Sequence, residues 1–213
     1  MEAIARAADG ESVAQPARIL LVCSPARGGI ASHVVALLKG LQADGYQVGV
    51  ACEPEGVIAE VARELDVPVY AVKLRGAGVS SARRAAPRAP QAPASPLRSA
   101  LAALQVRQAS AAMRAQVIHT HSFRAGVLGA AILAMPLTGG VRLVATIHNY
   151  LPGAHTMGGR HARHPWAIRL MVRRASRLIT VSEALRRELV EAWPDAEAKS
   201  VCIPTEWIRA RRP

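Results

Sequence analysis

The hydrophobic positions of this chain change their spacing in a regular order. A continuous apolar run at 19–23 is followed by a turn at 24–29 and then by apolar residues at helical spacing over 30–41. A second apolar run starts at residue 48, just after the Asp44-Gly45 pair that ends the helix. A strand, a turn, a helix and a strand in this order predict a right-handed crossover between parallel strands.

The same alternation continues along the chain. Strands are expected at 67–74, 116–121, 141–147, 178–181 and 200–203, and helices at 55–65, 97–113, 125–135, from 165, and at 182–191. Seven strands alternating with six helices predict an α/β protein with a doubly wound, mostly parallel sheet and helices on both faces.

One folded domain is expected over residues 17–203, after a flexible leader at 1–16 and before a short tail at 204–213. Residues 76–96 interrupt the alternation, with a proline at every third position from 87 to 96 and three arginines nearby. This composition excludes a packed helix or a central strand and predicts a solvated surface loop. Contact of its arginines with phosphate or a membrane surface is the alternative.

Composition narrows the class of protein. With 51% hydrophobic but only 3% aromatic residues, the core is expected to consist mostly of Ala, Val, Leu and Ile. The three cysteines are far apart and each falls in an expected strand, which predicts reduced thiols in a cytoplasmic protein. The longest apolar stretch, 125–137, is too short to span a membrane, and the N-terminus is no secretory signal.

The net charge of +12 suggests an acidic partner, but only three of the 27 basic residues are lysines. The excess of arginine and alanine is also what coding bias produces, and no aromatic platform accompanies it, so nucleic-acid binding is not expected. A second interpretation is a non-catalytic module that docks on anionic lipid through the loop 76–96 and the helix at 166–177. A core helix with solvated arginines is the favoured interpretation of that second segment.

Polar residues gather where the expected strands end, and ligands of parallel sheets bind at the carboxyl ends of the strands. The candidates are Arg27, Gly28, Gly29, His119, His121, His148, Asn149 and Ser182, with His33 one helical turn beyond the glycines. Bare backbone N–H groups at a helix N-terminus favour an anion. The glycine spacing differs from G-x-G-x-x-G, so no dinucleotide cofactor is expected.

His119 and His121 are two residues apart on one strand and share a face, which is a geometry able to hold a metal. Carboxylate ligands are nearly absent from the strand ends, so no metal is expected. Each histidine can equally be a polar residue that closes the end of a strand.

Four motifs follow one another: R-G-G-x3-H at 27–33, V-I-H-T-H at 117–121, T-I-H-N at 146–149 and L-I-T-V-S-E-A-L at 178–185. In this order they resemble the N-terminal domain of family 4 glycosyltransferases, over about residues 18–203. The resemblance implies one half of the retaining GT-B architecture, in which two Rossmann-like domains face each other across a cleft. It implies transfer from a nucleotide-diphosphate sugar to a glycan, lipid or small-molecule acceptor, without a cofactor.

The resemblance also implies roles for the candidates. Gly28 and Gly29 are expected beside the diphosphate, and His121 at the transferred sugar as the catalytic residue. The remaining substrate-binding candidates are Arg27, His33, His119, His148, Asn149 and Ser182. The N-terminal domain mainly selects the acceptor, and peripheral contact with the inner face of the membrane is a further option.

The sequence departs from the family after Ile203-Pro204, where the expected N-G of the linker is missing. The chain is therefore expected to be a truncated product or to work with a separate C-terminal half. Alone it is expected to be inactive, because half of the transition-state contacts would be missing.

Overall fold

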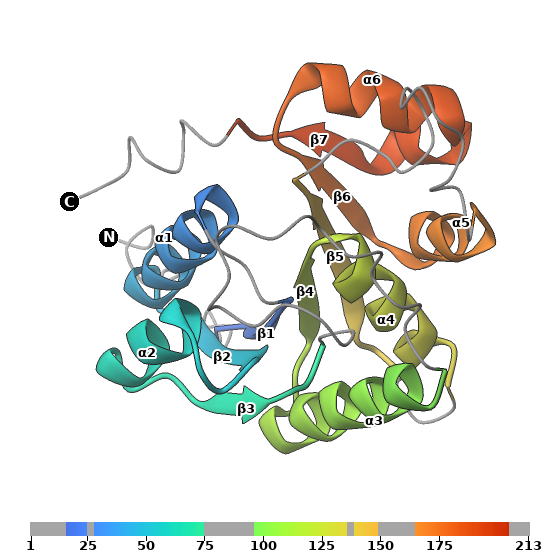
Figure 1. Ribbon diagram of the computed structural model, residues 1–213. Coiled ribbons are helices and arrows are strands. Elements are labelled where there is room, and N and C mark those ends of the chain that lie inside the picture. The colour runs from blue at the N-terminus through green and yellow to red at the C-terminus, as the bar shows by residue number, and fades with distance from the viewer. Residues whose placement is uncertain (1–15, 25–27, 75–95, 136–138, 149–164, 205–213) are drawn as a thin grey trace, which may run out of the picture.

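The computed structural model describes residues 16–24, 28–74, 96–135, 139–148 and 165–204. Its strands form a single parallel sheet in the order β3-β2-β1-β4-β5-β6-β7 (Figure 1). The strands are β1 Arg18–Cys23, β2 Gln47–Cys52, β3 Val69–Ala71, β4 Val117–His121, β5 Arg142–Ile147, β6 Arg177–Thr180 and β7 Ser200–Cys202. The helices are α1 Gly29–Ala43, α2 Val57–Glu64, α3 Pro96–Met113, α4 Phe123–Leu133, α5 Pro165–Arg174, α6 Glu183–Ala192 and the 3₁₀ helix η1 Pro194–Lys199.

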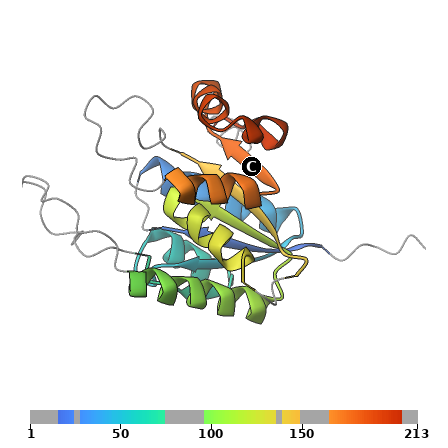
Figure 2. The same ribbon diagram turned by 90° about the vertical axis from the view of Figure 1, so that its right-hand side faces the viewer.

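The helices form two layers, as right-handed crossovers from a central β1 require. One layer contains α1 and α2, whose Val34 and Ala59 belong to the same buried cluster as Leu21 of β1. The other cluster joins Leu20 of β1 to residues of α3, α4, α5 and α6. Figure 2 shows α3, α4 and α5 lying side by side across that second face. The predicted doubly wound sheet with helices on both faces is confirmed.

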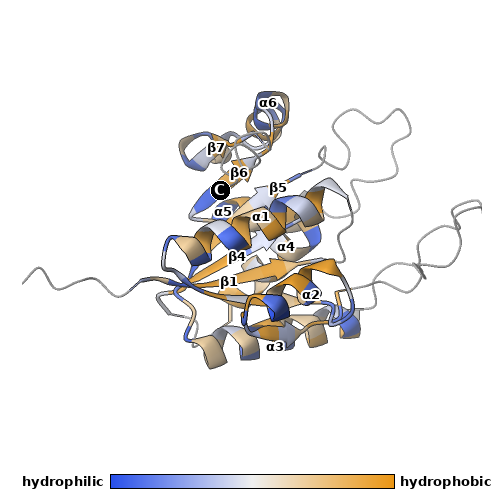
Figure 3. Ribbon diagram, turned by 90° about the vertical axis from the view of Figure 1, so that its left-hand side faces the viewer, coloured by the Kyte–Doolittle hydropathy of each residue, from blue (hydrophilic) through white to orange (hydrophobic). Residues whose placement is uncertain are grey.

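Aliphatic residues fill both faces of the central strands. From Leu20 to Cys23 every side chain of β1 is fully buried, which is typical of a parallel strand covered on both sides. Figure 3 shows β1 as a hydrophobic strand between helices that also carry hydrophilic residues. The predicted aliphatic core is confirmed.

Two glycines let α4 approach its neighbours closely. A Cβ atom on Gly126 would clash with the sulfur of Met171 in α5, and one on Gly129 would lie 2.8 Å from Cδ1 of Leu143 in β5. The small residues of α4 therefore allow close packing on both the sheet and α5.

The largest differences between the sequence-based elements and the structure are at β3 and at η1. A strand was expected over 67–74, but β3 comprises only three residues, because pairing to β2 is confined to Val69–Ala71. Val72 and Leu74 are nevertheless buried, so their apolar character reflects the core and not the sheet. The helix η1 was not expected.

The three cysteines are free thiols in β1, β2 and β7, as expected from their positions. Of the helices in the described ranges, none combines the length and apolarity that crossing a membrane requires. The leader 1–15, the segment 75–95 and the tail 205–213 lie outside the described residues.

Candidate functional site

The register of the sheet places three histidines on one face at the carboxyl ends of β4 and β5. His121 is aligned with Cys23 of β1 on one side and with Thr146 of β5 on the other. Because side chains two residues apart in a strand share a face, His119 lies on the face of His121. His148 follows Thr146 by two residues and extends the same row.

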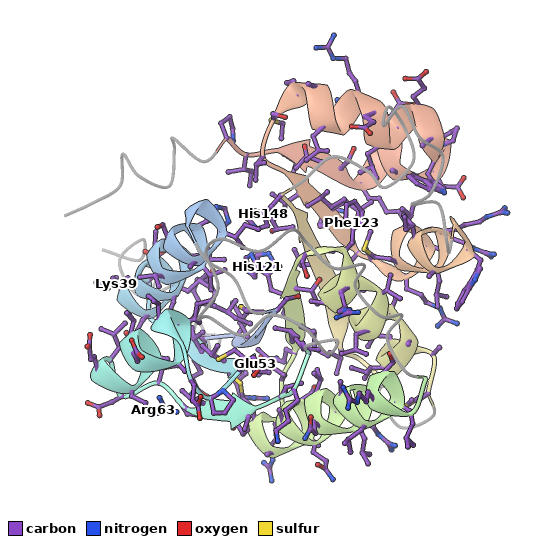
Figure 4. All side chains as sticks on the ribbon, viewed as in Figure 1. Lys39, Glu53, Arg63, His121, Phe123 and His148 are labelled. Atoms are coloured by element: carbon purple, nitrogen blue, oxygen red, sulfur yellow. The ribbon has the colours of Figure 1, made fainter. Side chains whose placement is uncertain are left out.

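A fourth histidine reaches this row from the helix above it. His33 is on α1, one turn after Gly29, and is buried. Its ring centroid lies 4.7 Å from that of His148 and 5.6 Å from that of His121, both edge-on. Figure 4 shows His121 and His148 next to each other between α1 and the strands β4 and β5. We call His33, His119, His121 and His148 the histidine cluster.

Two diagonal contacts, from β4 to Thr146 and His148, orient the rings of His119 and His121. Nε2 of His119 lies 2.8 Å from Oγ1 of Thr146, and Nδ1 of His121 lies 3.3 Å from Nε2 of His148. The rings of His119 and His121 are 4.4 Å apart and tilted by 32°. Thr146 was not among the predicted site residues, although its place two residues before His148 would have put it on the same face.

Two buried nitrogens of the cluster have no hydrogen-bond partner among the described residues: Nδ1 of His33 and Nε2 of His121. His121 is only 1% exposed, whereas His148 is half-buried and is the member most accessible to a ligand. Leaving a buried polar atom unpaired costs about 1–3 kcal/mol. These two ring nitrogens are therefore available to form a hydrogen bond or to ligate an ion, because no described residue engages them.

The histidines of the cluster are neutral at pH 7. Burial lowers the pKa of His119 to about 3 and that of His148 to about 4, and the neighbouring imidazoles contribute to both shifts. Burial also lowers the pKa of His33, and it lowers the pKa of His121 well below its ordinary value. A neutral imidazole donates one hydrogen bond and accepts another, so the cluster can bind hydroxyl groups without placing positive charge beside them.

The N-terminus of α1 lies one turn from His33. Gly28 occupies the N-cap with a φ of 61°, which glycine adopts without strain, and no side chain caps the helix. The first turn contains no acidic residue, and a Cβ atom on Gly28 or Gly29 would meet nothing within 4 Å. Among the described residues nothing occupies the positive end of the dipole, where an anion is favoured.

The remaining candidates are placed as follows. Ser182 follows β6 and accepts a hydrogen bond from the Leu185 N–H at 3.3 Å, so it caps α6. No described contact joins Ser182 to the histidine cluster. Arg27 and Asn149 lie outside the described residues. Two further polar residues, not predicted as site residues, follow strands at the same edge of the sheet: Ser24 after β1 and Ser122 after β4, whose hydroxyl oxygens lie 2.6 Å apart.

Helix α5 packs as a core helix on its apolar side. Ala167, Ile168, Met171 and Val172 are buried, while Arg169, Arg173 and Arg174 are exposed. Trp166 is 65% exposed. The apolar face that lipid docking would use is therefore largely occupied by the core.

Comparison with solved structures places this arrangement among known folds. HepE from Anabaena, solved in complex with UDP-glucose, superposes with a TM-score of 0.62 at 19% identity, over 88% of this chain and 43% of that one. UDP-N-acetylglucosamine 2-epimerase from Rickettsia bellii gives 0.56 at 11% identity, over 92% and 47%. A structure of sucrose-phosphate synthase from Thermosynechococcus elongatus gives 0.53 at 14% identity, over 91% and 92%.

These likenesses establish the fold: a Rossmann-like sheet that corresponds to the N-terminal half of a GT-B protein. The chain spans less than half the length of HepE and of the epimerase. No sequence among the curated proteins matches it. The sequence profile described as Glycosyltransferase Family 4, however, matches residues 27–205, which is most of the chain. The chain therefore belongs to glycosyltransferase family 4.

Proposed function

We propose that this chain forms the acceptor-side half of a glycosyltransferase and one wall of the cleft in which a sugar leaves a nucleotide diphosphate. The observation that carries the proposal is the position of the histidine cluster directly below the open N-terminus of α1. One ligand that combines a diphosphate with a sugar can engage both features. The acceptor is a glycan, a lipid or a small molecule.

The chemistry of glycosyl transfer fits the two features. Negative charge develops on the leaving diphosphate, and backbone N–H groups at Gly28 and Gly29 with the α1 dipole would stabilise it. Positive charge develops on the sugar ring, so a cationic side chain there would oppose the reaction. The cluster is buried and neutral at pH 7, so it adds no such cation.

His121 is the residue we assign to the transferred sugar. Its Nε2 atom is buried without a partner among the described residues, and a sugar hydroxyl would provide one. His148, as the most accessible ring, would meet the same ligand. His33 and His119 would hold these two rings in place from α1 and from Thr146. Ser182, Arg27 and Asn149 remain proposed substrate-binding residues.

Residues 1–213 alone should bind donor weakly, because one wall of a cleft provides only part of the contacts to the donor. We test this with amide and imidazole NMR spectra of the chain during titration with UDP-glucose as the probe, and with UDP and glucose separately. Millimolar binding is expected, with shifts at Gly28 and Gly29 for both nucleotides and at His121 for UDP-glucose. Transfer is expected only after a C-terminal half is supplied.

The His121→Gln variant should lose the sugar-dependent shifts and keep those at Gly28 and Gly29. Gln116 and Arg142, at the opposite ends of β4 and β5, serve as internal controls and should not shift. Submicromolar binding of UDP-glucose by this chain alone, or shifts confined to the opposite edge of the sheet, would refute the proposal.

A further inference from the structure

Three members of the histidine cluster converge on a common point. His33, His121 and His148 each offer one ring nitrogen, and these nitrogens all lie within 4.8 Å of one another. We propose that they bind one divalent transition-metal ion, best matched by Zn²⁺, and leave a fourth position of the ion for water or a ligand. This proposal goes beyond sugar transfer and does not rest on it. The ion would occupy His121 and His148, which the proposed function assigns to the sugar, and would place a cation beside it, so the metal-bound chain would not support transfer.

The distances suit a tetrahedral ion. Zinc–imidazole bonds of about 2.0–2.1 Å at the tetrahedral angle separate two ligand nitrogens by about 3.3 Å. Nδ1 of His121 and Nε2 of His148 are separated by 3.3 Å. The limit of 4.8 Å on the distances between the three ligand nitrogens exceeds that ideal by about 1.5 Å. Rotation of the His148 and His33 rings about their side-chain torsions can shorten these distances.

Burial also favours ligation. Nδ1 of His33 is a buried nitrogen without a partner among the described residues, and a metal would satisfy it. His33 and His121 are themselves buried and are positioned by α1 and β4, so binding requires only adjustment of the ring torsions.

The donor set selects the class of metal. Three imidazoles without a carboxylate suit Zn²⁺, Cu²⁺, Ni²⁺ or Co²⁺, whereas Mg²⁺ and Ca²⁺ require oxygen ligands. His119 is not a ligand in this arrangement, because its Nε2 atom is engaged by Thr146 at 2.8 Å. Its ring, 4.4 Å from that of His121, instead holds His121 in orientation.

The test measures bound metal directly. The chain is stripped with a chelator and titrated with Zn²⁺ against a chromophoric competitor, and separately with Co²⁺ while visible absorption is recorded. We expect one Zn²⁺ per chain with micromolar affinity or tighter, and the intense absorption bands of four-coordinate Co²⁺. The absence of both from the unaltered chain would overturn the proposal, without recourse to any variant.

Variants locate the site. The His33→Gln and His148→Gln substitutions should each weaken Zn²⁺ binding by at least about tenfold and abolish the Co²⁺ bands, with unchanged circular dichroism. The matched control replaces the three other histidines together, as His155→Gln, His161→Gln and His164→Gln, and should keep both signals. Unchanged binding in the double variant H33Q/H148Q, or loss of binding in the control, would refute the assignment. Because neither readout involves a nucleotide sugar, a negative result leaves the transferase proposal standing.

Discussion

The hydroxyl oxygens of Ser24 and Ser122 lie 2.6 Å apart, although 98 residues separate them in the chain. Ser24 follows β1 and Ser122 follows β4, so this hydrogen bond ties together the ends of two neighbouring strands beside His121. Ser122 also caps α4 by accepting a hydrogen bond from the Ala125 N–H at 3.3 Å. Its φ of 130° is a conformation that costs most residues other than glycine about 1–3 kcal/mol.

Two substitutions separate the strain at Ser122 from its hydrogen bonds. Ser122→Ala removes both hydrogen bonds and keeps the strain, so we expect the free energy of unfolding to fall by about 1–2 kcal/mol. Ser122→Gly removes the same bonds but relieves the strain, and should cost less than the alanine variant. Urea denaturation measures both. Ser182→Gly, at a cap with ordinary extended backbone, is the control for losing a cap without relief of strain. Equal losses for S122A and S122G would contradict the role of strain.

Glycine-to-alanine changes in two helices should have opposite effects. A methyl group on Gly40 of α1 would meet nothing within 4 Å, so Gly40→Ala should raise the free energy of unfolding by about 0.5–1 kcal/mol through helix propensity. Gly129→Ala of α4 would bring its Cβ within 2.8 Å of Leu143 and 3.1 Å of Thr120. Overpacking of this kind costs about 1–3 kcal/mol. Thermal unfolding followed by calorimetry compares them, and stabilisation by both would show that α4 can shift away from the sheet.

Stability should fall as the pH is lowered below 6.5. The cluster histidines have lowered pKa values in the folded chain, about 3 for His119 and about 4 for His148, whereas unfolded histidines titrate near 6.5. Below pH 6.5 the unfolded chain therefore binds more protons, and each such histidine lowers the free energy of unfolding by up to about 1.4 kcal/mol per pH unit. The full contribution is present above pH 6.5.

Urea denaturation of chelator-treated protein between pH 8 and pH 5 measures this slope. His148→Gln removes one of the titrating groups and should make the slope shallower. Constant stability between pH 7 and pH 5 would mean that the cluster accepts protons without cost in the folded chain.

Binding to anionic vesicles should depend on charge alone. Because α5 buries Ile168 and Met171 in the core, it offers a lipid surface mainly its exposed arginines, with Trp166 as the one large apolar side chain exposed among the described residues of α5. Such binding is screened as the Debye length shortens to about 8 Å at physiological ionic strength. Sedimentation with phosphatidylserine vesicles should therefore show binding at low salt that disappears at physiological salt. Binding that survives high salt would favour the alternative of a lipid-docking module.

The arrangement of the sheet could be predicted because it depends on local patterns. The continuous apolar run at Ile19–Cys23 reflects a strand buried on two faces, and the helical spacing after Gly29 reflects a helix buried on one face. Neither pattern requires knowledge of distant residues. The edge strand β3 was overestimated for the same reason. Val72 and Leu74 are apolar because they are buried, and the sequence alone does not show which apolar residues also find a pairing partner.

The candidate site could be predicted only in part. Placement of His119 and His121 on one face follows from the period of a strand, and His148 follows from the common edge of a parallel sheet. The approach of His33 depends on the rotation of α1 on the sheet, which packing of the whole layer determines. The same holds for the 3.3 Å contact between His121 and His148. The sequence therefore suggested that these histidines share one edge of the sheet, and tertiary packing brings three of them around one point.

The central position of β1 has a consequence for how the chain folds. Its pairing with β2 aligns Arg18 with Gln47, but its pairing with β4 aligns Ile19 with Val117. The first contact closes a short loop and the second a long one, so we expect β1, α1 and β2 to assemble early and β4 to join in a slower step. The entropy of closing a loop rises only logarithmically, by about 0.6 kcal/mol for each doubling of its length. A longer connection before β4 would therefore lower the free energy of unfolding only slightly. Its main effect would be a slower rate of folding.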